Sequence, residues 1–302
     1  MQRKQKVVIV VGPTSSGKSA LAVRLAKRFN GEVVSADSRQ VYTGLDIGTG
    51  KVTKKEMEGV PHHMLDIVSP RNIMSAGAYA KSAHRACAEI LERGRVPIIT
   101  GGTGFYIDVL VGRIALPEVP VDTTLRERLG KRSAASLFSL LKGRDAARAR
   151  AMDTASERNN KVRLIRALEV AAALGTVPAQ APRTTFDVLW IGIAPPFDRL
   201  EKKIRSRLGS RIRAGMVAEA AALHRDGLTF RRMEQIGLEY GALARLLQKR
   251  VTRDEFEEEL FRDIRRYAKK QLAYWKRNKA IVWFEAPSDI RIPKRVAAFL
   301  KK

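Results

Sequence analysis

The sequence contains a single cysteine, Cys87, among its 302 residues. One cysteine excludes an internal disulfide and a zinc site built from several thiolates, and it is typical of a protein kept in a reducing compartment. Acidic residues are also scarce. The chain has 31 Asp and Glu but 57 Lys and Arg, which gives a net charge of +26. Solubility does not require so large a charge, whereas a nucleic-acid partner does, because neutralised phosphates release condensed counterions.

Long apolar segments are absent as well. No run approaches the length that spans a membrane, and the apolar residues after the N-terminus are too few for a signal peptide. An anionic membrane surface is therefore a weaker candidate partner than nucleic acid, and we expect a cytoplasmic monomer without membrane contact. Apolar residues still make up 45% of the chain, which suffices for one large domain or for a domain with an insertion.

A phosphate-binding loop of the pattern G-x-x-x-x-G-K-S lies near the N-terminus. An apolar run typical of a buried parallel strand, Val7–Val11, precedes it, and the amphipathic segment Ala20–Ala26 follows as a helix. In this context the backbone N–H groups and the helix N-terminus hold phosphate, Lys18 adds a charge, and the Ser19 hydroxyl can ligate Mg²⁺. The residues of the loop are Gly12, Pro13, Thr14, Ser15, Ser16, Gly17, Lys18 and Ser19.

Strands and helices alternate over most of the chain, which predicts an α/β fold with a parallel sheet covered on both faces. The carboxyl edge of such a sheet binds ligands. We therefore expect Asp37, at the end of the second strand, and the glycine-rich turn 101–106 to lie beside the phosphate-binding loop. The predicted strands are Val7–Val11, Glu32–Asp37, Val96–Thr100, Val188–Ile193 and Ile281–Phe284.

Five further helices are predicted within this α/β pattern. The last long one should begin at a capping box formed by Thr252 and Glu255. Its buried stripe is predicted as Phe256, Leu260, Ile264, Ala268, Leu272 and Trp275. The five helices are predicted from the cap at Ser75 to Arg93, and at Phe197–Ala214, Val217–His224, Met233–Leu247 and Asp254–Arg277.

The pattern changes to helical signals alone in the middle of the chain. Between Leu125 and Ala173 there are 12 Lys and Arg against 5 Asp and Glu, a net of +7. We predict an all-helical, basic insertion at 115–183 within a core formed by 1–114 and 184–302. Judged on charge alone, the insertion is either a solvated helix pair or a nucleic-acid-binding domain.

Six blocks of sequence resemble the tRNA dimethylallyltransferases, which are the bacterial tRNA isopentenyltransferases. The resemblance implies a P-loop kinase-like α/β core and a helical insertion that grips the anticodon stem-loop of tRNA. It also implies transfer of the dimethylallyl group from dimethylallyl diphosphate to N6 of the adenosine just 3′ of the anticodon, which yields N6-isopentenyladenosine and diphosphate. The blocks are GPTSSGKS (12–19), SADSRQVYTGLDIGTGK (35–51), PHHMLDI (61–67), GGTGFY (101–106), RALEV (166–170) and RYAKKQLAYWKR (266–277).

The proposed chemistry has one demanding step for each substrate. Charge that builds on the leaving diphosphate must be neutralised, which the loop amides, Lys18 and Mg²⁺ would do. Adenine N6 is a poor nucleophile and must lose a proton, so a carboxylate helps; the resemblance assigns this role to Asp37. A carboxylate that binds Mg²⁺ through water is the alternative role for Asp37. By resemblance, Arg207 contacts diphosphate and Thr103 belongs to the catalytic set.

The resemblance also implies a set of tRNA contacts. Single-stranded RNA loops present unstacked bases, which a protein can take up individually. The chain departs from the family pattern at Gly50, Asn159, Asn160, Leu238 and Ile264, which puts details of these contacts in question. The implied tRNA-binding residues are Asp37, Ser38, Arg39, Gln40, Thr103, Lys161, Val162, Arg163, Leu164, Ile165, Arg265, Lys269 and Lys270.

Three other functions compete with this one. A small-molecule or nucleotide kinase would use the same loop for ATP, with Asp37 activating a hydroxyl. An adenylate isopentenyltransferase would use a free nucleotide as acceptor and would need neither the insertion nor the charge. A non-enzymatic RNA-binding module would leave the phosphate-binding loop unexplained.

Overall fold

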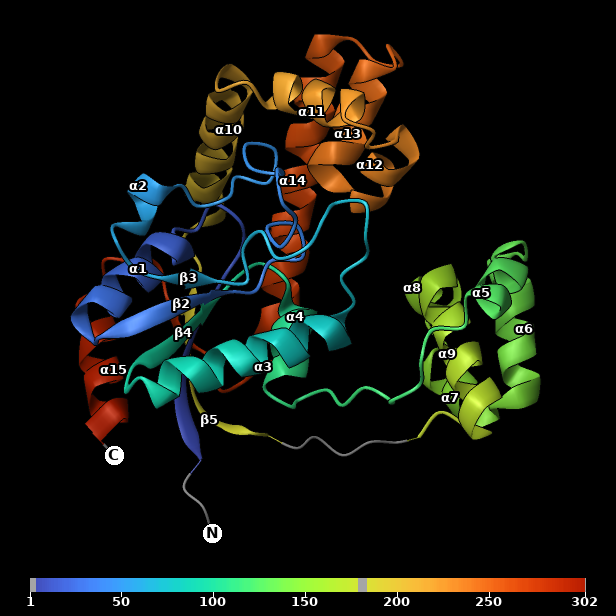
Figure 1. The fold of residues 1–302 in the computed structure, drawn as a ribbon, viewed down its shortest axis with the longest axis horizontal. Helices are drawn as coiled ribbons and strands as arrows, with labels where there is room; N and C mark the ends of the chain where they lie inside the picture. The colour runs from blue at the N-terminus through green and yellow to red at the C-terminus, as the bar shows by residue number, and fades with distance from the viewer. Residues whose placement is uncertain (1–3, 179–183, 302) are drawn as a thin grey trace. The chain divides into compact units, whose positions relative to one another are not determined.

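The computed structural model describes residues 4–178 and 184–301. These residues form two compact units (Figure 1). The larger unit combines residues up to 113 with residues from 184 onward, and the smaller unit contains residues from 114 to 178. Each unit is described by itself below.

A parallel sheet organises the larger unit. Its six described strands have the order β3-β2-β4-β1-β5-β6, and every neighbouring pair is parallel. This arrangement confirms the predicted α/β class. The strands are β1 (Gln5–Val11), β2 (Gly31–Ser35), β3 (His62–His63), β4 (Val96–Thr100), β5 (Phe186–Ile193) and β6 (Val282–Phe284).

Both faces of the sheet are buried by helices. Along β1, Val7, Ile9 and Val11 enter one apolar cluster, while Val8 and Val10 enter another. Helices α1 and α15 cover the second cluster, and α3 and α4 contribute to the first. The helices of this unit are α1 (Lys18–Arg28), α2 (Lys54–Met57), α3 (Ala76–Glu92), α4 (Gly104–Leu110), α10 (Phe197–Arg213), α11 (Met216–Arg225), α12 (Phe230–Ile236), α13 (Leu238–Leu247), α14 (Arg253–Lys276) and α15 (Arg291–Lys301).

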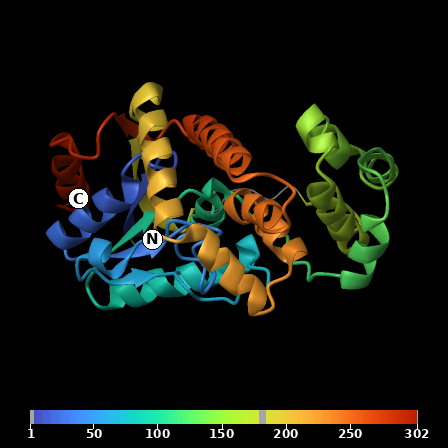
Figure 2. The same cartoon turned by 90° about the horizontal axis from the view of Figure 1, so that it is seen from above.

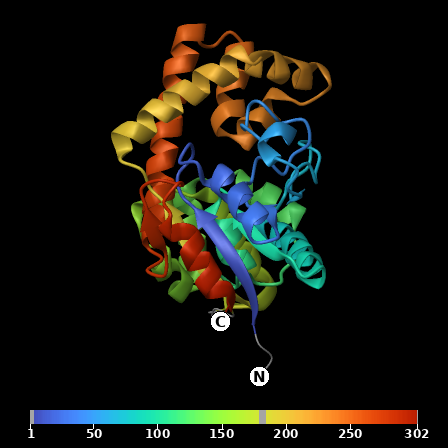
Figure 3. The ribbon, with the colours of Figure 1, turned by 90° about the vertical axis from the view of Figure 1, so that its left-hand side faces the viewer.

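Helices α10–α14 stand at the carboxyl edge of the sheet. Figure 3 shows β1 rising from the N-terminus towards them, and Figure 2 looks down on this layer, with α10 in gold and α11–α14 in orange. Because the strands are parallel, the loops after β1, β2 and β4 all open towards this layer. The fold thus places a layer of helices at the carboxyl edge of the sheet.

The buried stripe of α14 differs from the prediction in two ways. Phe261 is buried although the predicted stripe did not contain it. Gln271 is buried and Leu272 is partly exposed, whereas Leu272 was expected in the core. A helix has 3.6 residues per turn, so positions spaced by four residues gradually rotate away from the buried face. A step of three residues after Ala268 corrects this rotation and places Gln271 in the core. The capping box predicted from Thr252 and Glu255 is present at the start of this helix.

Two local predictions need correction, and two short elements were not predicted. The helix predicted over Met233–Leu247 is two helices, because Gly237 adopts φ +78° and ψ −172°, which interrupts the helical path. Helix α2 and the two-residue strand β3 lie in a segment that gave no periodic signal. Strand β2 ends at Ser35, so Asp37 lies in the loop after the strand and not within it.

Cys87 lies in the core, as its place on the apolar face of α3 predicts. Its side chain has no exposed surface, and burial raises the pKa of the thiol to about 12. A thiol with so high a pKa is not ionised at neutral pH, so it is a packing residue and not a nucleophile.

The smaller unit is entirely helical in its described part and has its own core. Leu137, Leu141 and Leu164 are fully buried there. Glu169, from the RALEV block, is also buried; burial alone would raise its pKa, but hydrogen bonds from Arg126 and Arg166 lower it to about 2. The unit contains α5 (Thr123–Gly130), α6 (Ala134–Arg144), α7 (Ala146–Ala151), α8 (Ala155–Arg158) and α9 (Lys161–Leu174).

None of the helices described in either unit combines the length and the apolar character needed to cross a membrane.

Candidate active site

The phosphate-binding loop forms one wall of a pocket at the carboxyl edge of the sheet. Gly17, with φ +90°, precedes α1, and no side chain within the described residues caps the N-terminal amides of this helix. Such uncapped amides, together with the helix dipole, favour an anion at this end. Ser16 Oγ is buried without a hydrogen-bond partner in the described part of the chain, so the loop retains an unused polar group.

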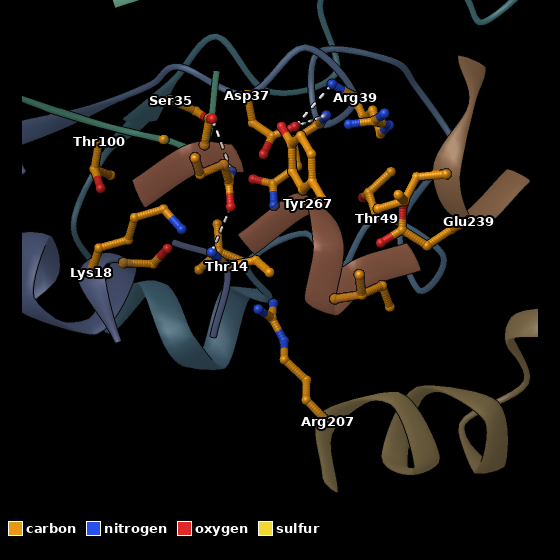
Figure 4. A pocket seen from close by; sticks show the side chains of 18 of the residues that line it. Thr14, Lys18, Ser35, Asp37, Arg39, Thr49, Thr100, Arg207, Glu239 and Tyr267 are labelled. Carbon is orange, nitrogen blue, oxygen red and sulfur yellow. Dashed lines mark hydrogen bonds between the residues drawn. The ribbon is translucent and has the colours of Figure 1, made fainter. Parts of the chain in front are cut away.

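Lys18 extends from the start of α1 into the pocket (Figure 4). Its ammonium donates to the Pro13 carbonyl at 3.3 Å. Burial lowers the pKa of Lys18, Asp37 opposes this shift and Arg207 adds to it, and together they leave the pKa at about 8. A desolvated ammonium whose charge is only partly compensated interacts strongly with an incoming phosphate group.

This lowered pKa predicts that an anion such as diphosphate binds the pocket in a pH-dependent way. Below about pH 8 the folded protein carries the Lys18 charge, and above it the charge is lost. We expect the affinity for diphosphate to fall by up to about tenfold per pH unit above that value. Calorimetric titrations from pH 6.5 to 9.5 measure this, and Lys18→Arg, which stays charged, is the reference. Parallel profiles for the two proteins would contradict the assignment.

Asp37 and the second glycine-rich turn form the opposite wall. Asp37 Oδ1 accepts from the backbone N–H groups of Arg39 (2.9 Å) and Gln40 (3.4 Å). Thr103 Oγ1 accepts from the Ser38 N–H at 2.9 Å, which joins the two loops. A Cβ on Gly101 would lie 2.1 Å from the Ala36 carbonyl oxygen, so only glycine allows this approach. The turn thereby holds the Asp37 loop in place.

Arg207 reaches the pocket from α10. Its Nη2 donates to the Gly50 carbonyl at 2.8 Å, and Gln40 Nε2 donates to the same oxygen at 3.3 Å. The predicted catalytic residues Lys18, Asp37 and Arg207 therefore line one pocket. Thr103 is held beside them through its contacts with Ser38.

Comparison with known proteins agrees with this geometry. The family model described as IPP transferase matches residues 40–278. The chain belongs to the IPP transferase family. The tRNA dimethylallyltransferase of Leuconostoc citreum is 38% identical over 298 residues, which cover 98% of this chain and 99% of that relative.

Two further relatives support the same assignment. The tRNA dimethylallyltransferase 1 of Hahella chejuensis is 37% identical over 283 residues, covering 92% of this chain and 91% of the relative. The crystal structure of the full-length tRNA isopentenylpyrophosphate transferase from Bacillus halodurans matches with a TM-score of 0.73 at 33% identity, covering 99% of this chain and 96% of that chain. The resemblance expected from the sequence blocks is therefore confirmed.

Gln271 is a pocket residue of this IPP transferase family member that sequence reasoning missed. Its Oε1 accepts from the Thr14 backbone N–H at 2.8 Å, and its Nε2 donates to the Gly102 carbonyl at 2.9 Å. The amide therefore connects the phosphate-binding loop with the second glycine-rich turn. The available signal was the three-residue step from Ala268, which places the Gln271 amide on the buried face of α14, where buried amides are usually hydrogen-bonded.

Replacing Gln271 by Met should separate the two loops. The Thr14 N–H and the Gly102 carbonyl would each be left without a buried partner, at about 1–3 kcal/mol per group. We expect the free energy of unfolding, measured by urea titration, to fall by an amount in that range or above it. Gln235→Met, at an exposed position of α12, is the control and should change the midpoint little. Equal effects of the two substitutions would contradict the bridging role.

Other pocket residues were also not predicted. Tyr267 and Glu239 line the pocket beside Arg39, whose Nε donates to the Ile236 carbonyl at 3.2 Å. Two departures from the family pattern, Leu238 and Ile264, line the pocket as well. The sequence marked Leu238 and Ile264 only as departures from the family pattern, and it gave no sign that they line the pocket.

The remaining predicted tRNA contacts lie outside this pocket. In α9, Leu164 is fully buried in the helical core, whereas Val162 is 78% exposed and Lys161 and Arg163 also lie at the surface. In this segment, therefore, only the exposed side chains are placed to contact tRNA, and the side chain of Leu164 is not. Asn160, one of the departures, caps α9 by accepting from the Arg163 N–H.

The predicted contacts on α14 face two directions. Arg265 Nε lies 3.0 Å from Glu201 Oε2 on α10, and the Lys269 ammonium lies 4.8 Å from the centre of the Phe197 ring. Lys270 is exposed. These positions remain predicted tRNA contacts, and Arg265 would have to exchange its carboxylate partner for a phosphate.

Proposed function

We propose that this chain transfers the dimethylallyl group from dimethylallyl diphosphate to N6 of the adenosine 3′-adjacent to the tRNA anticodon. The observation that carries the proposal is the convergence of Lys18, Arg207 and Asp37 on one pocket. Two of these are cations suited to diphosphate, and the third is a carboxylate suited to a proton. The apolar side chains of Val33, Val52 and Ile264 in the same pocket suit the dimethylallyl group.

The proposed reaction exchanges one bond for another. The bond between C1 of the donor and the diphosphate oxygen breaks as the bond between C1 and adenine N6 forms. The loop amides, Lys18 and Arg207 stabilise the charge on the departing diphosphate. The N6 proton passes to Asp37 Oδ2, because Oδ1 already accepts from two backbone N–H groups.

Magnesium fits this site as an ion that the donor brings with it. Within residues 4–178 and 184–301, no group of three or more His, Cys, Asp or Glu is arranged to hold a metal by itself. Mg²⁺ commonly takes substrate phosphates and few protein ligands, and the Ser19 hydroxyl at the start of α1 would be such a ligand. When bound, the ion would neutralise part of the diphosphate charge.

The proposal is tested by incubating the chain with labelled dimethylallyl diphosphate, Mg²⁺ and unmodified tRNA, followed by mass analysis of nucleosides. N6-isopentenyladenosine in tRNA is the expected product, with no consumption of ATP added alongside. Labelling of free AMP instead of tRNA would favour the adenylate isopentenyltransferase. Hydrolysis of ATP without isopentenyl incorporation would favour the kinase.

We further propose that the helical unit and α14 hold the tRNA, and that the chain works as a cytoplasmic monomer. The net charge of +26 supports an RNA partner. The helical unit contributes a basic surface of its own, as its excess of Lys and Arg implies.

Removing three basic residues of α14 should reduce the salt dependence of tRNA binding. Neutralising Arg265, Lys269 and Lys270 should lower the slope of log K against log salt by roughly 0.7–0.9 for each phosphate that the protein no longer neutralises. Filter binding between 50 and 300 mM salt measures it. The control removes the same charge from α15, at Lys294, Arg295 and Lys301. Equal slopes for the two triple variants would show that α14 is only a solvated face.

A further inference from the structure

Glu219 of α11 is not among the residues that line the pocket, and the proposed reaction does not use it. Its Oε2 accepts from the backbone N–H groups of Asp46 at 3.0 Å and Ile47 at 2.7 Å. Its Oε1 accepts from the Gly48 N–H at 2.8 Å and from the Tyr240 hydroxyl at 2.6 Å. A single carboxylate therefore fastens three consecutive amides of the loop between β2 and α2.

The fastened segment leads directly to the Gly50 carbonyl. The Gly50 N–H donates to the Ile47 carbonyl at 3.1 Å, which closes the turn. The Gly50 carbonyl then accepts from both Arg207 and Gln40. Its position consequently sets the direction of two side chains that line the pocket.

The same turn packs tightly against two helices. A Cβ on Gly48 would lie 2.7 Å from atoms of Tyr240, whose side chain is fully buried in α13. Burial and the nearby Glu219 raise the pKa of this phenol, so it remains a hydrogen-bond donor. Arg211 of α10 donates to the Gly48 carbonyl at 2.8 Å. The loop has little freedom while these contacts persist.

We propose that Glu219 is a positioning residue for the diphosphate site. Glu219 holds residues 46–48 and thereby fixes the position of the Gly50 carbonyl. That carbonyl accepts a hydrogen bond from Arg207 and orients its guanidinium towards the donor. The inference rests on the proposed function, in which Arg207 contacts diphosphate. Four donors converge on this carboxylate, and an amide cannot replace it, because an amide presents one accepting oxygen and turns an NH₂ group towards an N–H.

A double-mutant cycle between Glu219→Gln and Arg207→Ala tests the proposal. The measured quantity is the affinity for inorganic diphosphate with Mg²⁺, by titration calorimetry. We expect Glu219→Gln to weaken binding by roughly tenfold when Arg207 is present, and by about twofold or less when it is Ala. Equal losses in the two backgrounds, or no loss in either, would overturn the proposal.

Two further variants guard against a general effect on folding. Glu258→Gln removes an exposed carboxylate that pairs with Arg205 and should leave diphosphate affinity unchanged. Tyr240→Phe keeps the ring and removes one donor to Glu219, so it should give a smaller loss that also depends on Arg207. If Glu219→Gln does not fold, a double-mutant cycle between Tyr240→Phe and Arg207→Ala replaces the first one. Additive losses of diphosphate affinity in that cycle would overturn the proposal.

The assay also distinguishes this inference from the proposed function. Isopentenyl transfer to tRNA by the unaltered chain is measured separately. A chain that binds diphosphate but transfers nothing would contradict the proposed reaction, while the cycle would still report on Glu219. If the unaltered chain transfers the isopentenyl group normally but the losses of diphosphate affinity in the cycle are additive, only the inference about Glu219 is contradicted.

Discussion

Lys18→Ala should lower kcat/KM for isopentenyl transfer by roughly 10²–10³-fold or more, because it removes the central cation from the leaving diphosphate. The loss should appear with donor saturating as well as limiting, since the charge on diphosphate grows as the bond breaks. Binding of tRNA should remain close to that of the unaltered chain, because other surfaces are proposed to hold the acceptor. Steady-state kinetics with labelled donor and a tRNA binding assay measure the two quantities.

Lys27→Ala is the matched control for this prediction. Lys27 lies on the same helix, but it is 53% exposed and pairs with Glu58 at the surface. Folding should not explain the loss at Lys18. Because burial makes the pKa of Lys18 lower in the folded than in the unfolded protein, the Lys18 charge destabilises the fold below about pH 8, and removing the side chain relieves that cost. Near-normal turnover of Lys18→Ala at saturating donor would mean that the donor binds elsewhere.

Asp37→Asn should reduce kcat by roughly 10²–10⁴-fold, the usual effect of losing a general base. The substitution isolates the chemistry, because the Asn side-chain oxygen can still accept from the N–H groups of Arg39 and Gln40. The loop should therefore keep its shape, and the affinity for the donor should change little. Single-turnover rates and donor titrations provide the two measurements.

The alternative role of Asp37 gives a different pattern. If Asp37 instead holds water on Mg²⁺, Asp37→Asn should weaken Mg²⁺ and donor binding to an extent that matches the loss of rate. Asp198→Asn, at an exposed position of α10, is the control for loss of a carboxylate.

Local patterns predicted much of the fold. The run Val7–Val11 became the central strand β1, because a strand buried on both faces must be apolar throughout. The capping box at Thr252 and the cap at Ser75 were found from a few neighbouring residues, since capping is a local interaction. By the same reasoning, Gly237 could have been recognised as a break between two helices.

The sequence by itself determined the phosphate-binding loop, the parallel sheet, the charge that favours an RNA partner and the family. These features depend on neighbouring residues or on composition. Only the tertiary structure decided which distant side chains act on that loop. Gln271 meets Thr14 across 257 positions, and Glu219 meets Asp46 across 173. No local pattern encodes such pairings, because they arise when helices from the second half of the chain pack over loops from the first.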